Sequence, residues 1–187
     1  MAILSQSDME KIGFASVGEN VLISDRASFY GAAKISIGNH VRIDDFCVIS
    51  AGLGGVVIGN YVHIAVASTL IGAGAISIAD FVNISSKVSI YSSSDDYSGT
   101  AMAGPMLPPE FTNFDVSPVQ IARHAIIGAG SVLLPGALLD EGVAVGALSL
   151  IKGHCKAFGI YAGSPARRIM ERRRDLLKLE ESFLTRK

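Results

Sequence analysis

The sequence has few of the features that would assign a chain to a membrane or to nucleic acid. Its 187 residues carry a formal net charge of −1, so no basic surface indicates a nucleic-acid partner. Gly, Asp and Ser interrupt its apolar stretches, and none reaches the roughly 18 residues that a membrane-spanning helix needs. The first nine residues lack a basic start followed by a long apolar block, so we expect no signal peptide and a cytoplasmic protein.

What the sequence does have is a six-residue period. Ile, Leu or Val, and once Phe, returns every sixth residue in groups of three, and extra residues follow the third member of each early group. A repeat of this length is typical of a solenoid, whose turns cannot bury their apolar side alone and stack on their neighbours. The periodic residues are Val17, Ile23, Phe29, Ile37, Ile43, Ile49, Ile58, Ile64, Leu70, Ile78, Ile84, Ile90, Ile121, Ile127, Leu133, Leu139, Val145 and Ile151.

Each six-residue unit predicts one short strand and one corner, and three units predict one triangular coil. The position four residues after each periodic residue is usually small and also points inward. Cys47 and Cys155 both fall on this position, so we expect inert core thiols rather than catalytic, metal-binding or disulfide-bonded ones. We therefore predict an all-β solenoid of about six triangular coils. An antiparallel sandwich is the alternative, but it has no reason to hold one six-residue phase through four groups.

The sequence divides into three parts. Residues 1–16 contain the run Ser7–Glu10, a candidate capping box for a short helix. Residues 17–158 form the predicted solenoid, which a loop at about 91–118 interrupts. So long a loop inside a regular fold is usually functional or disordered, and we expect it to help build a pocket. Residues 159–187 form a C-terminal segment and a helix, which we expect to cover the open end of the solenoid.

Three segments near the C-terminus carry the pattern of a known family. The runs Ile126–Gly136 (IIGAGSVLLPG) and Val145–Leu150 (VGALSL) resemble the last two coils of the hexapeptide-repeat acyltransferases. Tyr161–Ile169 (YAGSPARRI) resembles their closing motif. Within that family the chain is most similar to the sugar and cell-surface polysaccharide acetyltransferases, including the galactoside and xenobiotic types. The resemblance implies a left-handed parallel β-helix, a homotrimer with active sites between neighbouring subunits, and acetyl-coenzyme A lying along the groove.

The resemblance also implies residues that would bind the coenzyme. Ala129 and Ala147 match family positions whose backbone groups bond the pantetheine arm, and a bulky side chain there would close the groove. Lys152 lies near the family's Thr–Lys pair but one residue early. Arg167 and Arg168 suit the coenzyme phosphates, since guanidinium groups bind phosphate through paired hydrogen bonds. A charged helix start on the surface is the alternative for these two arginines.

Acetyl transfer from a thioester needs a base near the acceptor and a donor for the developing oxyanion. Galactoside-type members place a histidine five residues after the periodic residue that enters the long loop, and this sequence has Asp95 there. A carboxylate, with an unperturbed pKa near ~4, is a poor base for a sugar hydroxyl, so we expect Asp95 or Asp96 to orient a histidine or to bind the acceptor. His63 is the candidate base. Asn83, at the matching position one coil above, is the candidate acceptor or oxyanion contact. A corner histidine bonded to a neighbouring turn is the alternative for His63.

These residues favour an acetyltransferase that moves acetyl from acetyl-coenzyme A to a sugar hydroxyl or amine in surface polysaccharide or lipopolysaccharide biosynthesis. N-acetylation of a nucleotide-linked amino sugar is the alternative. A zinc carbonic anhydrase on the same β-helix needs three converging histidines. We expect no metal, because His40, His63, His124 and His154 differ widely in position and phase, and we expect all but His63 to be solvated. A non-catalytic scaffold would need neither the long loop nor the closing motif.

Overall fold

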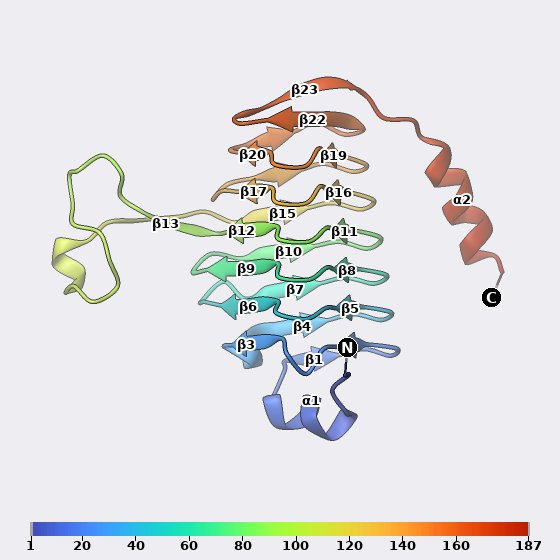
Figure 1. Cartoon of the computed structure of the whole chain (residues 1–187), viewed down its shortest axis with the longest axis horizontal. Helices are drawn as coiled ribbons and strands as arrows, with labels where there is room; N and C mark the ends of the chain where they lie inside the picture. The colour runs from blue at the N-terminus through green and yellow to red at the C-terminus, as the bar shows by residue number, and fades with distance from the viewer. Residues whose placement is uncertain (1, 187) are drawn as a thin grey trace.

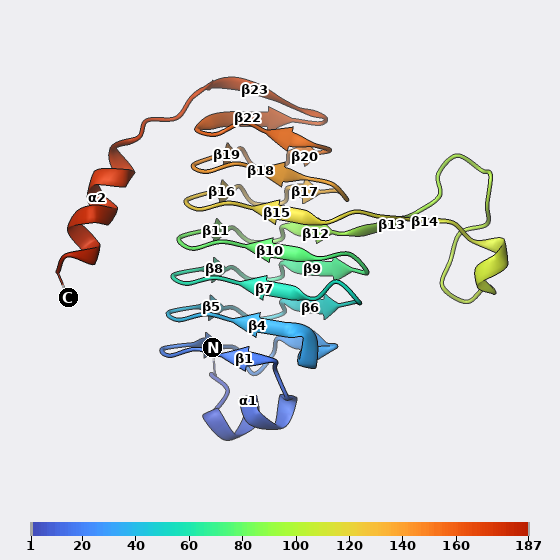
Figure 2. The same ribbon diagram turned by 180° about the vertical axis from the view of Figure 1, so that it is seen from behind.

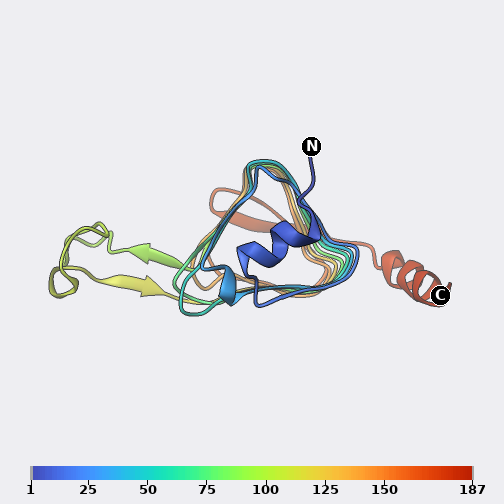
Figure 3. The ribbon, with the colours of Figure 1, turned by 90° about the horizontal axis from the view of Figure 1, so that it is seen from below.

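The computed structural model describes residues 2–186, which form a left-handed parallel β-helix (Figure 1). Each coil adds one short strand to each of three sheets, so the sheets run along the whole column (Figure 2). Seen along the column, the cross-section is triangular (Figure 3). The first sheet contains β1 (Ser16–Val17), β4 (Ile35–Ile37), β7 (Val56–Ile58), β10 (Ile76–Ile78), β15 (Val119–Ile121), β18 (Leu138–Leu139) and β21 (His154–Cys155). The second contains β2 (Leu22–Ile23), β5 (Arg42–Ile43), β8 (His63–Ile64), β11 (Asn83–Ile84), β16 (Ile126–Ile127), β19 (Ala144–Val145), β22 (Gly159–Gly163) and β23 (Ala166–Glu171). The third contains β3 (Ser28–Tyr30), β6 (Val48–Ala51), β9 (Thr69–Gly72), β12 (Ser89–Tyr91), β17 (Val132–Leu133) and β20 (Leu150–Ile151).

The six-residue period corresponds to the buried side of these strands. Every periodic residue from Ile37 onward is at most 4% exposed, whereas Val17 and Phe29 in the first coil are partly exposed because that coil has a neighbour on one side only. Six coils are complete and a seventh has only β21 and β22. The prediction of an all-β solenoid of about six coils is therefore confirmed.

Three corners join the sheets, and we name them in chain order. The first corner joins the first and second sheets, the second corner joins the second and third sheets, and the third corner leads into the next coil. At the first corner four aromatic residues of successive coils adopt φ between 56 and 60°, which brings their rings into one stack. These residues are His40, Tyr61, Phe81 and His124.

Both cysteines lie in the core. Cys47 and Cys155 are buried free thiols, as their small inward position predicts. Burial raises the pKa of the Cys47 thiol and raises the pKa of Cys155 to about 11, so both are protonated and poorly nucleophilic near neutral pH.

The interruption after the fourth coil is an ordered arm rather than a structureless loop. Its stem is an antiparallel ribbon of β13 (Ser93–Asp95) and β14 (Phe114–Val116), and its tip holds the 3₁₀ helix η2 (Pro109–Phe111). The arm leaves the column at the third corner and projects away from it (Figure 3). The coils on either side still stack directly, because β12 pairs with β17 and β10 with β15. A second 3₁₀ helix of the same length, η1 (Ala32–Lys34), lies at the same corner after β3.

Helix α1 (Gln6–Ile12) covers the N-terminal end of the column (Figure 3). Its capping box is formed by Ser5 and Asp8, each side chain accepting a hydrogen bond from the other's backbone N–H, rather than by the expected Ser7–Glu10 run. Met9 of the helix and Phe14 just after it pack against the core. This segment therefore shields the apolar residues of the first coil from water.

Helix α2 (Asp175–Leu184) does not cover the opposite end, and that expectation was wrong. Strand β23 instead turns back antiparallel on β22, and α2 lies beside the first corner (Figure 1). There the Phe183 ring meets Tyr61 and Phe81 edge-on, with centroid distances of 5.2 and 6.2 Å. The Glu180 carboxylate accepts a hydrogen bond from Arg123. The column end is instead occupied by β23, and the stacked rings receive the apolar face of the helix. Within residues 2–186 no helix is long and apolar enough to cross a membrane.

Candidate functional site

Outward-facing polar side chains form a row on the second sheet. In each strand of this sheet the residue before the buried periodic residue points away from the core, since side chains alternate along a strand. Parallel pairing aligns these residues from coil to coil in the order Leu22, Arg42, His63, Asn83, Ile126, Ala144 and Ile160. The three polar members of the row are consecutive.

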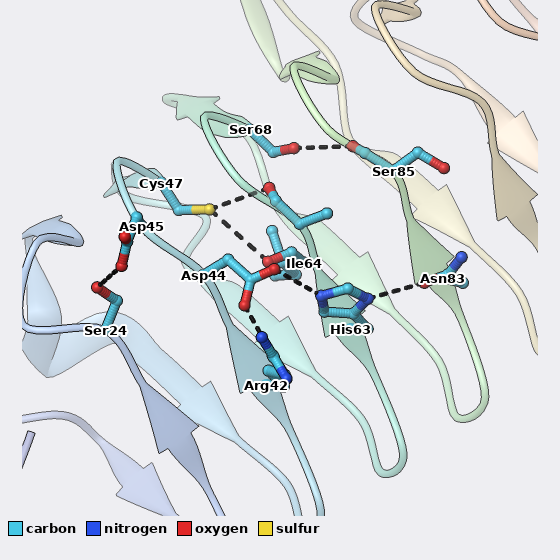
Figure 4. A network of polar contacts seen from close by, with 11 residues as sticks. Ser24, Arg42, Asp44, Asp45, Cys47, His63, Ile64, Ser68, Asn83 and Ser85 are labelled. Carbon is cyan, nitrogen blue, oxygen red and sulfur yellow. Dashed lines mark hydrogen bonds and ion pairs between the residues drawn. The ribbon is translucent and has the colours of Figure 1, made fainter. Parts of the chain in front are cut away.

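His63 is hydrogen-bonded through both ring nitrogens (Figure 4). Its Nε2 lies 2.9 Å from Oδ2 of Asp44, and its Nδ1 lies 3.2 Å from Oδ1 of Asn83. The other Asp44 oxygen, Oδ1, accepts a hydrogen bond of 2.7 Å from Arg42 Nε. The structure therefore brings the candidate base and Asn83 together and adds Asp44 and Arg42 to them.

Asp44 is well enclosed while His63 remains open to a ligand. The Asp44 side chain is 15% exposed and the His63 side chain 40%. Burial alone would raise the pKa of Asp44, but the hydrogen bonds from Arg42 and His63 outweigh it and hold that pKa below its usual value. Asp44 is therefore a carboxylate at neutral pH.

The two loop carboxylates lie on the arm. Asp95 ends β13 and accepts a hydrogen bond of 3.2 Å from the Gly104 N–H. Asp96 accepts bonds from three groups of the arm, and these bonds hold its pKa far below its usual value. Asp95 and Asp96 both line a pocket of about 500 Å³ between the arm's strands. Within one chain Asp95 and His63 belong to different parts of the fold: Asp95 ends β13 on the arm, which leaves the column at the third corner (Figure 3), whereas His63 begins β8 in the second sheet.

The candidate coenzyme residues lie higher on the column. Ala129 and Ala147 are exposed and stack on each other at the second corner, where the Leu148 N–H donates to the Ala129 carbonyl. Lys152 and Arg167 line one pocket of about 400 Å³ at the C-terminal end. The structure does not bring Arg168 there, since Arg168 follows Arg167 in a strand and pairs with Glu171 at 2.9 Å.

The remaining histidines make three different sets of contacts. His40 stacks on Tyr61 at the first corner. His154 binds Asp140 at 2.8 Å and is exposed, as expected. His124 was expected to be solvated, but its side chain is only 10% exposed, stacked on Phe81 and bonded to Glu180. Burial and, next, the Arg123 charge lower the His124 pKa.

Sequence reasoning missed Asp44 and Arg42. The available signal was the alternation Arg42–Ile43–Asp44, which places two charges on either side of a buried residue in the coil below His63. Metal binding has no support in residues 2–186, which contain no group of three or more His, Cys, Asp or Glu arranged to hold an ion.

Comparison with known proteins finds two curated relatives, and both are acyltransferases. The chain is 55% identical over 183 residues to a dTDP-4-amino-4,6-dideoxy-D-glucose acyltransferase of Escherichia coli, covering 98% of this chain and 95% of the relative. It is 32% identical over 157 residues to WbbJ of E. coli K12, described as a lipopolysaccharide biosynthesis O-acetyl transferase, covering 83% of this chain and 70% of WbbJ. No family model matches the chain.

Solved structures agree with these relatives. A variant of AntD, an N-acyltransferase from Bacillus cereus, in complex with dTDP and coenzyme A superposes with a TM-score of 0.96 at 45% identity, covering 100% of both chains. The acetyltransferase domain of PglB from Neisseria gonorrhoeae, at 21% identity and a TM-score of 0.59, supports the fold alone. Fold and relatives together define an acyl-CoA-dependent acyltransferase, which confirms the expected reaction class and donor. The chain belongs to the hexapeptide-repeat sugar acyltransferases.

Proposed function

We propose that the chain transfers an acyl group from acyl-coenzyme A to the 4-amino group of a dTDP-linked 4-amino-4,6-dideoxy sugar. The observation that carries this proposal is the 55% identity, over 98% of the chain, with an E. coli acyltransferase of that sugar nucleotide. The AntD complexes with dTDP-4-amino-4,6-dideoxyglucose and coenzyme A, at 45% identity, support the same acceptor. A hydroxyl acceptor has weaker support, from WbbJ at 32% identity.

The reaction forms a C–N bond and breaks the thioester C–S bond. The amine must lose a proton as it attacks the carbonyl, and imidazole is the side chain best suited to take a proton near neutral pH. We assign this step to His63 and a contact with the acceptor or the oxyanion to Asn83, because they lie side by side on one open face. The row continues up the column toward Ala129 and Ala147, where we place the pantetheine arm, with Lys152 and Arg167 on the coenzyme phosphates.

We assign binding of the amine to Asp95. Among the solved AntD variants are substitutions of an aspartate and of a serine ten positions apart in its chain. In this sequence the same spacing separates Asp95 from Ser85, a partly exposed residue two positions after Asn83. A carboxylate from the arm is suited to accept a hydrogen bond from the neutral amine and so to orient the nitrogen lone pair toward the thioester.

A homotrimer would bring these groups together. Asp95 lies on the arm and His63 in the second sheet of the column, so in the site that we propose the arm comes from a neighbouring copy. Apolar side chains are unusually exposed both on the arm, at Tyr97 and Met106, and at the second corner, at Phe46 and Leu148. Such surfaces need cover, and an arm lying over a neighbour's second corner would supply it.

Complementation tests the shared site. His63→Ala and Asp95→Ala proteins should each have low activity, and subunits mixed after reversible unfolding should regain it, because about a quarter of the interfaces in random trimers would combine both native residues. No recovery in mixed trimers would place both residues in one subunit's site. A monomer in light scattering would exclude the shared site altogether.

Product analysis tests the reaction. The purified chain should convert dTDP-4-amino-4,6-dideoxyglucose to an amide with acetyl-coenzyme A or a longer acyl donor, detected by mass spectrometry. Absence of an amide with donors up to 3-hydroxybutyryl-coenzyme A, the ligand of one AntD complex, would contradict the proposal. A role in surface polysaccharide or lipopolysaccharide synthesis draws support from WbbJ, and a cytoplasmic location stays a prediction.

A further inference from the structure

We propose that Asp44 is a positioning residue that holds His63 with its proton on Nε2, so that Nδ1 is the atom that takes the proton of the acceptor. This inference rests on the proposed function, because it names the atom through which His63 acts. It concerns two residues, Asp44 and Arg42, to which no role in the reaction has been assigned so far.

The hydrogen bonds around Asp44 leave one arrangement of protons. Arg42 Nε can only donate, so the Asp44 oxygen at 2.7 Å from it must accept. The second Asp44 oxygen lies 2.9 Å from His63 Nε2, and an ionised carboxylate has no proton to offer it. The proton in this contact therefore belongs to His63 Nε2. In neutral imidazole the other nitrogen, Nδ1, then carries the lone pair.

The position of Nδ1 suits it to the transfer. Nδ1 faces Asn83, one coil further along the row, and thus the side of the column that leads to Ala129 and Ala147 (Figure 4). Nε2 faces back toward Asp44, away from that side. In the structure Asn83 presents Oδ1 to Nδ1, the orientation that accepts from the protonated ring; while the ring is neutral, the amide turns over and its NH₂ group donates to Nδ1.

The proton and electron balance is complete with these groups. The amine nitrogen gives its lone pair to the thioester carbonyl carbon and its proton to His63 Nδ1. The C–S bond breaks with its electron pair on sulfur, and the thiolate takes the proton back from His63. Asp44 stabilises the imidazolium between the two steps without itself being protonated.

Substituting Asn for Asp44 should therefore do more harm than removing the side chain. Arg42 Nε needs an oxygen opposite it, so the new amide must place its oxygen toward Arg42 and its NH₂ group toward His63 Nε2. Nε2 would then have to accept, the proton would move to Nδ1, and the base would be blocked. Asp44→Ala leaves both tautomers accessible. A residue with only a structural role would give the opposite order.

The tautomer is measured directly by two-bond ¹H–¹⁵N NMR of the histidine rings in the intact protein, with no acceptor present. We expect a protonated Nε2 for His63 in the parent and a protonated Nδ1 in Asp44→Asn. Asp140→Asn makes the same change beside His154, which binds Asp140 at 2.8 Å, and should leave the His63 signals in place. A parent His63 with its proton on Nδ1 would overturn the inference.

Kinetics supply the second measurement. With acetyl-coenzyme A and dTDP-4-amino-4,6-dideoxyglucose we expect Asp44→Asn to lower kcat about 10²-fold, as for loss of a general base, and Asp44→Ala about tenfold. Adding Arg42→Met to Asp44→Asn frees the amide to turn its oxygen toward His63 and should restore part of the loss. An Asp44→Asn protein more active than Asp44→Ala would refute the positioning role. If NMR shows both expected tautomers but the parent makes no amide, the proposed function fails and the positioning of His63 stands.

Discussion

Gly128→Ala should destabilise the column by forcing apart two coils at the second corner. A β-carbon added to Gly128 would lie 2.5 Å from the Ala147 nitrogen, 2.7 Å from the Gly146 carbonyl carbon and 2.8 Å from the Val145 oxygen. Ordinary contacts to a β-carbon are 3.4 to 4 Å. All three atoms belong to the backbone, so no side-chain rotation relieves the clash, and the coil that carries Ala147 must move.

The cost of that movement can be estimated from overpacking in protein cores. Extra methyl groups in a packed site cost typically 1–3 kcal/mol, and a clash with backbone alone favours the upper end, about 3 kcal/mol. For a chain of this size that corresponds to a fall in Tm of roughly 6 to 12 °C. Gly153→Ala is the matched control, because its β-carbon would meet nothing within 4 Å and should change stability by less than about 1 kcal/mol.

Thermal and denaturant unfolding at equal protein concentration measures the difference. The same displacement shifts Ala129 relative to Ala147, so coenzyme A should also bind more weakly to Gly128→Ala in calorimetry. Unfolding of Gly128→Ala within a degree of the parent, or an equal loss in Gly153→Ala, would show that coil spacing at this corner does not limit stability.

Three further predictions test the site. Ala147→Trp should abolish acetyl-coenzyme A binding with the fold intact. Unchanged affinity in calorimetry would show that the coenzyme does not bind beside Ala147. Lys152→Ala and Arg167→Ala should each weaken coenzyme A binding several-fold, while Arg168→Ala, whose native partner is Glu171, should not; equal losses would reject the pocket that the first two line. Asp44, with a pKa lowered by folding, stabilises the native state above about pH 4 and loses that contribution as pH falls through its folded pKa. Between about pH 5 and pH 2 the free energy of unfolding should therefore fall less in Asp44→Asn than in the parent, and parallel curves would contradict the assigned hydrogen bonds.

The solenoid could be predicted from the sequence because its cause is local and repeated. Buried residues such as Ile64 stand six positions apart, and the extra residues after every third one in the early groups imply three strands per coil. The hand of the helix does not follow from the spacing, since a mirror-image coil would bury the same residues. The hand came from the resemblance to a family, as did the groove for the coenzyme.

The position of α2 could not be predicted because its partners come from distant parts of the chain. Apolar residues at helical spacing indicated the helix, but several apolar surfaces could have received it. Phe183 contacts Tyr61 and Phe81, which meet only because each stands at the same corner of successive coils in a left-handed backbone conformation. Nothing in the helix sequence specifies that stack.

Contacts in the candidate site could be predicted where the pairing register of the coils sets them, but not where they depend on the direction of a side chain in a corner. His63 and Asn83 stand one coil apart in the repeat, so their contact follows from the period. Asp44 stands just past a strand, where the chain enters a corner and side chains have no fixed direction. Whether Asp95 and His63 act together depends on the arrangement of separate chains, which the sequence of one chain leaves open.

The arm enters and leaves the column without changing the stacking of the coils around it. Ile90 pairs with Leu133 and Ile78 with Ile121 although the arm lies between them in sequence. The pairing of these coils therefore does not depend on the sequence of the arm. On the proposal that Asp95 of the arm binds the acceptor amine, folding and this part of acceptor recognition are encoded in separate stretches of the chain. The arm could then be exchanged for another of different length and chemistry while the coils, and the coenzyme site proposed on them, stay as they are. Acceptor preference could therefore diverge faster than the framework.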